Sequence, residues 1–230
     1  MTEIVINING VSKFFGEEQV LKEITLQFSG GRVYGIIGNN GSGKTVLFKC
    51  ICGFMKPDQG VIEVNRKRIG REIDFPEDIG IIIETPGFLP HCTGFRNLQI
   101  LADLRGRIRK EDIVRTLEKV GLDPKMKKHV CKYSLGMRQR LGIAQAIMED
   151  PKVLILDEPF NGLDKHGVLH IRNIIQELKK QGKTILLASH NAEDIRVLCD
   201  AVYEMDAGAV KEVKADEEST WHNSDLHTFA

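Results

Sequence analysis

The chain has 230 residues, a length that fits one large domain or a core domain with an inserted subdomain. Its 32 Lys and Arg residues balance its 32 Asp and Glu residues, so the composition gives no support to general nucleic-acid binding. Its five cysteines are odd in number and scattered, which argues against a disulfide framework and favours buried or semi-buried free thiols.

The first third of the chain carries strand patterns. Apolar and polar residues alternate over 3–8, 20–28 and 61–66, which predicts three strands, and the first of them is a strand and not a signal peptide. Residues 32–38 are more continuously apolar, as in a strand buried on both faces. A glycine-rich loop follows, and then an apolar helix that we expect to end at Gly53. The apolar runs are too short to span a bilayer, so spanning would fall to other chains.

Residues 86–150 lose the strand pattern and show helical spacing instead. Ile113, Leu117 and Val120 share one helix face, and Gly121 follows as a cap. We interpret this region as an inserted helical subdomain. Strands and helices then alternate again: a strand at 152–159, a helix at 167–182, a strand at 184–190, a helix at 192–199 and a hairpin around Ala207-Gly208. The pattern predicts a parallel α/β core formed by 1–85 and 151–215, with a polar tail at 216–230.

The segment GNNGSGKT, residues 38–45, fits the pattern G-x-x-x-x-G-K-[ST] between a strand and a helix. Glycines let the backbone N–H groups converge on phosphate oxygens, and the following helix presents its positive end to the same anion. Lys44 adds a charge for the β- and γ-phosphates, and the Thr45 hydroxyl suits Mg²⁺. The nucleotide contacts are assigned to Gly38, Asn39, Asn40, Gly41, Ser42, Gly43, Lys44, Thr45 and Val46.

Two adjacent carboxylates, Asp157 and Glu158, stand in the segment VLILDEP at the end of the strand predicted over 152–159. A carboxylate at the end of a buried strand is costly unless it serves a cation, so Asp157 is assigned as a Mg²⁺ ligand through a water. Glu158 lies beyond the strand end, where it can polarise the water that attacks a γ-phosphate. The alternative for this pair is a solvated acidic turn.

Over nearly its whole length the chain resembles an ABC ATPase. The segment YSLGMRQRLGIAQAIMEDPKVLILDEP, residues 133–159, resembles the signature sequence running into the Mg²⁺ strand. FNGLD resembles the D-loop with Asp164 in place, and LLASH resembles the strand that ends in the switch histidine, His190. SKFFG resembles the adenine-stacking loop, with Phe15 at the aromatic position.

The resemblance implies an α/β fold with a P-loop NTPase core, an antiparallel β subdomain and the inserted helical subdomain. It implies an ATPase that uses ATP and Mg²⁺, with Lys44, Glu158 and His190 in catalytic roles. Two such subunits pack head to tail, so that each ATP meets the other copy's signature helix. The implied partners are transmembrane permease subunits and a second ATPase subunit. The implied location is cytoplasmic, peripheral on the inner face of the cell membrane.

Two other classes of ABC protein remain as alternatives. One is a soluble, non-transport ATPase that acts on a macromolecular machine. The other is a regulatory nucleotide switch with little turnover. The lack of a second ATPase unit or a long coiled coil in the chain argues against the first, and Glu158 with His190 argues against the second.

The signature segment departs from the common LSGGQ. Ser134 and Gly136 remain, while Leu135 replaces a glycine and Met137 replaces a glutamine. Ser134 is a favoured N-cap, and it is assigned two compatible roles: capping its own helix and, in the closed dimer, meeting the other copy's γ-phosphate.

A second departure is Glu84, which stands where the family's Q-loop has a glutamine. It is assigned to the Mg²⁺ site and to nucleotide binding, since a carboxylate can ligate the ion or orient water. With the divergent signature, it resembles the branch of bacterial exporters that serves bacitracin resistance and lantibiotic immunity. In GFLPH, residues 87–91, Phe88 and Leu89 are either a docking edge for the membrane chains or core residues.

Overall fold

The computed structural model describes residues 3–84 and 87–213, so the predicted tail at 216–230 lies outside the described residues. The chain divides into two compact units, with boundaries at Pro76/Glu77 and at Ile185/Leu186. The first unit therefore contains both the beginning and the later part of the chain, and the second unit is the segment between them. The predicted boundaries of the helical subdomain, 86 and 150, stay a prediction.

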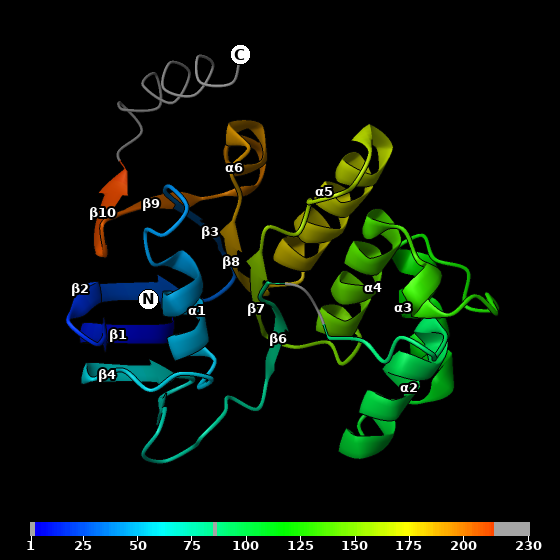
Figure 1. Ribbon diagram of the computed structural model, residues 1–230, viewed down its shortest axis with the longest axis horizontal. Helices are drawn as coiled ribbons and strands as arrows, with labels where there is room; N and C mark the ends of the chain where they lie inside the picture. The colour runs from blue at the N-terminus through cyan, green and yellow to red at the C-terminus, as the bar shows by residue number, and fades with distance from the viewer. Residues whose placement is uncertain (1–2, 85–86, 214–230) are drawn as a thin grey trace. The chain divides into compact units, whose positions relative to one another are not determined.

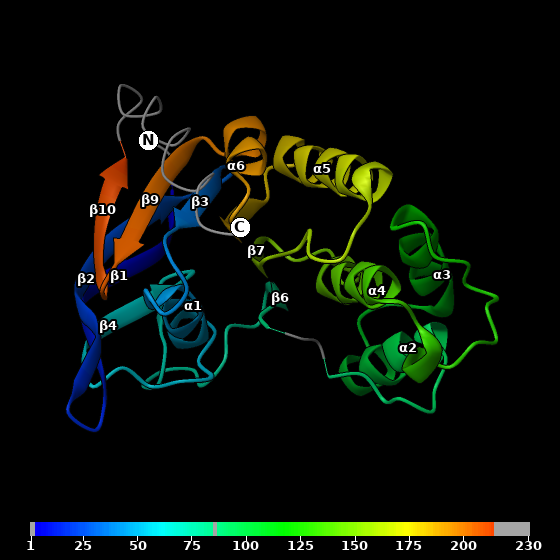
Figure 2. The ribbon, with the colours of Figure 1, turned by 45° about the horizontal axis from the view of Figure 1, so that its top comes forward.

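An antiparallel sheet forms one part of the first unit (Figures 1 and 2). Its strand order is β2 (Glu18–Ser29), β1 (Ile4–Phe15), β4 (Gln59–Val64) and β5 (Lys67–Arg68). The predicted strand at 3–8 is thus much longer than its pattern indicated. Register shifts in the β1–β2 pairing, such as the one between Ile8 and Val11, break the alternation of apolar residues that the prediction depends on.

The first unit also holds strands of the predicted α/β core. β3 (Val33–Ile37) runs parallel to β9 (Ala201–Asp206), which pairs with β10 (Ala209–Val213) in an antiparallel hairpin. Ala207 and Gly208 form its turn with φ angles of 44° and 84°, confirming the predicted hairpin. Helix α1 (Lys44–Ile51) packs beside β2 and β4, and Gly53 ends its turn with a φ of 78°. Helix α6 (Ala192–Leu198) follows β8 (Thr184–Ala188), which crosses the unit boundary.

The second unit combines a parallel strand pair with helices. β6 (Ile79–Ile82) runs parallel to β7 (Val153–Asp157), and α4 (Leu135–Ile147) packs directly on β6. A Cβ on Gly80 would lie 1.9 Å from the Ala146 carbonyl oxygen, so this contact requires a glycine. The other helices are α2 (Gly94–Arg105), α3 (Lys110–Lys119), the 3₁₀ turn η1 (Val130–Lys132) and α5 (Lys165–Lys180).

The predicted apolar face of α3 is confirmed, because Ile113, Leu117 and Val120 are all buried. Gly106, Gly121 and Gly182 follow helices with positive φ angles, as helix-ending glycines do. In the part of the chain that the structure describes, no helix is both long and apolar enough to cross a membrane.

The cysteines are free thiols in the structure, but they do not share one environment. Cys50 and Cys52 are buried, and burial raises the pKa of their thiols to about 11 and about 12. Cys131 is exposed, so the prediction of buried or semi-buried thiols is wrong for this residue.

Candidate functional site

A glycine-rich loop joins the end of β3 to the start of α1 in the first unit. Gly38, Gly41 and Gly43 have φ angles of 139°, 80° and 106°, so the loop uses backbone conformations that favour glycine. Lys44 folds back over the loop, where its Nζ donates to the carbonyl oxygens of Gly38 at 2.6 Å and Asn39 at 3.0 Å. The predicted phosphate loop is therefore formed by this unit alone, with its lysine held at the loop.

The β9–β10 hairpin braces this loop through backbone contacts. A Cβ on Gly38 would lie 2.0 Å from the carbonyl oxygen of Met205 in β9, closer than any side chain permits. The Gly208 N–H in the hairpin turn donates to the Ser42 carbonyl oxygen at 3.2 Å. The loop conformation thus depends on residues more than 160 positions later in the chain.

The donors of the loop suit an anion. Ser42 is only 4% exposed, and its Oγ has no hydrogen-bond partner among the residues that the structure describes. The N-cap of α1 is Gly43, which has no side chain to cap the first N–H groups, and the first turn of this helix contains no acidic residue. A buried hydroxyl with unused bonding capacity, uncapped helix N–H groups and Lys44 together fit a phosphate.

The predicted adenine platform is the last residue of β1. Phe15 pairs with Glu18 at the tip of the β1–β2 hairpin and is 48% exposed. The structure therefore places Phe15 at a strand end, whereas the resemblance had indicated a loop. Its exposed ring is available for stacking, and its contact with adenine stays a prediction.

Two carboxylates come at the end of β7 in the second unit. All of β7 is buried, including Asp157 at its end. Glu158 follows with a φ of 51°, in the left-handed region that residues with a Cβ rarely adopt. Gln139 of α4, itself buried, donates from Nε2 to the Glu158 carbonyl oxygen at 3.1 Å and so anchors this residue. Gln139 could not be recognised from the sequence, where it stands between Arg138 and Arg140 and nothing local points to this contact.

The signature segment begins with a helix cap. Ser134 is the N-cap of α4, and its Oγ accepts from the Met137 N–H at 3.2 Å, which confirms the capping role. Leu135 covers Gly162, since a Cβ on Gly162 would lie 2.4 Å from the Leu135 Cγ. A Cβ on Gly136 would lie 2.7 Å from the Gly162 carbonyl oxygen. The start of α4 is therefore in direct contact with the turn before α5, while Leu135 keeps 53% of its surface exposed.

Asp164 lies at the end of that turn, where it caps a helix. It is the N-cap of α5, and its Oδ1 accepts from the Gly167 N–H at 2.8 Å. The structure thus gives Asp164 a role within its own chain. Its predicted contact with nucleotide stays a prediction.

His190 is exposed in the turn that follows β8 in the first unit. Ser189 supports this turn: its Oγ donates to Asp194 Oδ2 at 3.0 Å and accepts from the Asn191 N–H at 3.2 Å. Both Ser189 and Asp194 are buried. This pair could not be recognised from the sequence, because Ser189 belongs to the motif LLASH while Asp194 lies outside it.

Glu84 is exposed and has a φ of 56° in the bend after β6. The next two residues lie outside the described part of the chain. Leu89 is 51% exposed, and Asn97 holds its backbone by donating to its carbonyl oxygen at 3.2 Å and accepting from its N–H at 2.7 Å. Leu89 is therefore a surface residue, Phe88 is half-buried, and their docking role stays a prediction.

The first unit carries the phosphate loop, Phe15 and His190, and the second carries Glu84, Asp157 and Glu158 with the signature and D-loop residues. Among residues 3–84 and 87–213, no group of three or more His, Cys, Asp or Glu side chains forms a metal site. Such a cluster is not required by the predicted Mg²⁺ site. Its three ligands are two carboxylates, Glu84 and Asp157, and the hydroxyl of Thr45. Their assignment stays a prediction.

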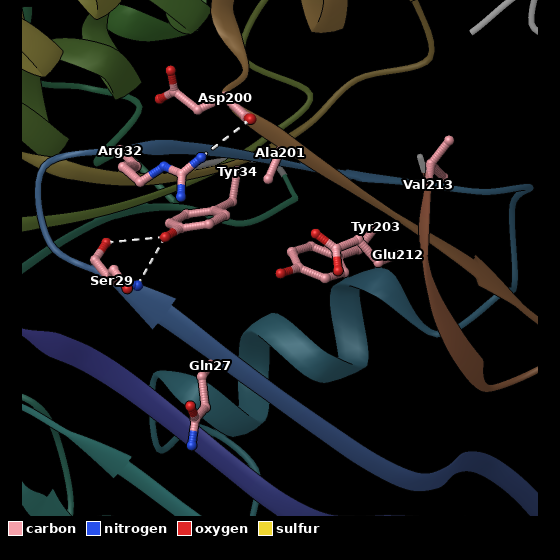
Figure 3. Close-up of a pocket in the computed structure, with 9 residues that line it drawn as sticks. All are labelled: Gln27, Ser29, Arg32, Tyr34, Asp200, Ala201, Tyr203, Glu212 and Val213. Atoms are coloured by element: carbon pink, nitrogen blue, oxygen red, sulfur yellow. Dashed lines mark hydrogen bonds between the residues drawn. The ribbon is translucent and has the colours of Figure 1, made fainter. Parts of the chain in front are cut away.

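A polar pocket of about 470 Å³ in the first unit is separate from these residues (Figure 3). The Tyr34 hydroxyl accepts from the Ser29 N–H at 2.8 Å and donates to the Ser29 carbonyl oxygen at 3.3 Å. Arg32 donates to the Asp200 carbonyl oxygen at 3.3 Å. These hydrogen bonds join residues that line the pocket to one another. None of the predicted site residues lines the pocket.

Comparison with known proteins identifies similar chains. The family model "ABC transporter" matches residues 21–161. The chain is 40% identical to YybJ of Bacillus subtilis (strain 168), an uncharacterized ABC transporter ATP-binding protein, over 90% of this chain and 95% of that protein. It is 41% identical to the bacitracin transport ATP-binding protein BcrA of Enterococcus faecalis, over 94% and 71%. It is 35% identical to the lantibiotic transport ATP-binding protein SrtF of Streptococcus pyogenes, over 86% and 85%.

The fold has close counterparts among solved structures. The ATP-binding subunit of an ABC transporter superposes with a TM-score of 0.82 at 26% identity, over 94% of this chain and 93% of that one. The predicted fold class is thereby confirmed.

Proposed function

The chain belongs to the ABC transporter family as an ATP-binding and ATP-hydrolysing subunit, and from this membership we propose how its own residues act and what it transports. The alternative of a soluble, non-transport ATPase is not supported by the relatives. The proposal covers the nucleotide contacts, the hydrolytic step, the second subunit and the class of substrate.

The triphosphate of ATP binds at the phosphate loop. The observation that carries this assignment is the buried Ser42 hydroxyl, which has no partner among the described residues and lies beside the uncapped start of α1. Lys44 places its charge at the β- and γ-phosphates by exchanging its bonds to the loop carbonyls for bonds to phosphate oxygens. Phe15 stacks on the adenine, because its exposed ring offers an apolar face.

Mg²⁺ would be held by Thr45, Asp157 and Glu84, which are hard oxygen ligands of the kind this ion prefers. The ion would neutralise charge on the β- and γ-phosphate oxygens. Glu84 adds one negative charge compared with the glutamine usual at this position.

Glu158 accepts a proton from the attacking water as the water oxygen bonds to the γ-phosphorus. The bond from that phosphorus to the β–γ bridging oxygen breaks, which releases ADP and phosphate. The strained backbone of Glu158, anchored by Gln139, fixes the direction of the carboxylate. His190 donates to a γ-phosphate oxygen from a turn that Ser189 supports.

A second ATPase subunit completes the site. It contributes its own Ser134 and Gly136 at the N-terminal end of α4, which is a favourable place for an anion, and its Asp164 near the water. The replacement of a glycine by Leu135 leaves the backbone donors of this helix end in place, because it changes a side chain and not the N–H groups. The Leu135 side chain itself packs over Gly162.

The test is the variant Glu158→Gln, which keeps the shape of the side chain and removes the base. We expect ATP turnover to fall on the order of 10²- to 10⁴-fold, the contribution of a general base, while ATP binding persists and a dimer accumulates. The matched control is Glu118→Gln, an exposed carboxylate on α3 that should turn over ATP normally. Normal turnover in Glu158→Gln would remove this residue from the mechanism.

The relatives support a proposal for the substrate class. BcrA and SrtF are named for bacitracin and lantibiotic transport, and we propose that this chain powers export of a peptide antibiotic or a similar drug. Permease subunits in separate chains would provide the membrane path. The ATPase would then lie in the cytoplasm against the inner face of the cell membrane.

A further inference from the structure

The end of β1 is fixed by a side chain from another part of the first unit. Asp58 precedes β4, and its carboxylate accepts from the Phe14 N–H at 2.7 Å and from Lys13 Nζ at 3.0 Å. Its own N–H donates to the Ser12 carbonyl oxygen at 2.9 Å. One residue thus binds three successive residues of β1, directly before Phe15.

These bonds continue the sheet where its ladder stops. The β1–β4 pairing ends with Ser12 of β1 opposite Gln59 of β4. Phe14 follows two residues later in β1 and therefore has no partner residue in β4. The Asp58 carboxylate takes the place of the missing strand and accepts the Phe14 N–H that would otherwise face solvent. Among the described residues, β2 is the strand that pairs with the last residues of β1.

The same carboxylate also holds the cation that lies over one face of the Phe15 ring. Lys13 Nζ lies over this ring, 5.8 Å from its centroid, and forms its ion pair with Asp58. The Lys13 side chain is only 15% exposed, which shows that it is packed in place. A cation on one ring face leaves the other face for an incoming base, and a phenylalanine has no hydroxyl group to fix its own position.

The charge of Asp58 persists under ordinary conditions. The Phe14 N–H and then the Lys13 ammonium hold the pKa of this carboxyl below its usual value of 3.8. Because the pKa is lowered in the folded state, its stabilising contribution is present above pH 3.8 and disappears only as the pH falls through the lower, folded value. The ion pair with Lys13 is therefore constant at neutral pH.

We propose that Asp58 is a positioning residue for adenine recognition, which fixes Phe15 through the Phe14 N–H and through Lys13. This inference rests on the proposed stacking of adenine on Phe15. Asp58 itself touches no part of the nucleotide. Its effect is confined to the base, because the triphosphate is bound by the phosphate loop.

The test compares two ligands on the full-length protein: ATP and inorganic tripolyphosphate, which lacks the base. Asp58→Ala removes both side-chain bonds to β1 and keeps the backbone bond to Ser12. We expect ATP affinity, measured by titration calorimetry, to fall roughly five- to tenfold, which is part of the stacking contribution. Tripolyphosphate affinity should stay unchanged, and KM for ATP should rise with kcat unaltered. A purely structural role would weaken both ligands together, and that result would overturn the proposal.

Three further variants separate the possible failures. Asp58→Asn keeps an acceptor for Phe14 but loses the ion pair, so its effect should lie between those of the wild type and Asp58→Ala. Phe15→Ala should weaken ATP binding, and adding Asp58→Ala to it should have no further effect if the two act as one unit. If Phe15→Ala binds ATP normally, the proposed stacking is wrong. If Phe15→Ala is weakened while Asp58→Ala is not, only the present inference fails.

Discussion

Two side chains that are proposed to contact nucleotide also have a structural role within their own chain. Ser134 and Asp164 both cap helices through bonds to backbone N–H groups, at 3.2 Å and 2.8 Å. Leu135 packs over Gly162 with its side chain. The residue that distinguishes this signature therefore has a packing role within its own chain.

The packing of Leu135 gives a prediction about stability. Leu135→Ala should lower the free energy of unfolding by about 1 kcal/mol, because contact with Gly162 is lost while helix propensity is preserved. Urea titration followed by circular dichroism measures this. Leu104→Ala is the control: Leu104 is 78% exposed, and its removal should cost less than about 0.5 kcal/mol. Equal costs for the two variants would show that the Leu135 contact contributes nothing.

At the scale of elements, the phosphate loop and the β9–β10 hairpin form one structural piece. Gly208 donates to Ser42 and accepts from the Lys22 N–H at 2.8 Å, so one turn residue connects the loop to β2. A Cβ on Gly208 would lie 2.6 Å from the Val20 carbonyl oxygen. The hairpin turn is therefore closely fitted to the loop, and a small change in it must move one of its neighbours.

Gly208→Ala should accordingly weaken ATP binding as well as stability. The residue has a φ of 84°, so the strain in the backbone and the contact with Val20 should together cost about 1–3 kcal/mol of unfolding free energy. KM for ATP should rise, since Ser42 is displaced. Gly70→Ala tests the backbone effect alone: Gly70 has a φ of 75° and open space around its Cβ position. An unchanged KM in Gly208→Ala would contradict the coupling between hairpin and loop.

The elements differ in how well the sequence predicts them. Helix ends were predictable because glycines mark them, as at Gly121 and Gly182. The hairpin turn at Gly208 was predictable from its local pattern, whereas its bond to Ser42 was not, because no local pattern relates residues so distant in sequence. β1 was predicted too short, since bulges hide its alternation.

The site shows the same limit. The phosphate loop and the strand that ends in Asp157 were recognised from motifs, which are contiguous in sequence. Gln139, Asp194 and Asp58 were not, because each acts on a motif residue through a contact made only in the folded chain. Motifs thus identify the groups that we propose to touch substrate, and the structure identifies the groups that hold them.

At the scale of the whole molecule, the chain is one part of a larger transporter. It supplies nucleotide binding and hydrolysis, and its relatives BcrA and SrtF are named for bacitracin transport and lantibiotic transport. A transport function therefore has to be tested together with the membrane subunits, in cells.

Deletion of the gene in its native host should lower the concentration of bacitracin or of a lantibiotic that inhibits growth. Export would cease because hydrolysis drives it, so complementation with the wild-type chain should restore resistance and complementation with Glu158→Gln should not. Growth-inhibition assays with both antibiotic classes make the measurement. Unchanged susceptibility to both would refute the proposed substrate class while leaving the ATPase function intact.

The uneven exposure of the thiols has a practical consequence for following the catalytic cycle. Cys50 and Cys52 have pKa values of about 11 and about 12, so they stay protonated and unreactive toward alkylating dyes at neutral pH. Cys131 is exposed and lies three residues before Ser134. The natural chain therefore carries its own attachment point for a fluorescent reporter beside the signature helix, where approach of a second subunit would change the emission.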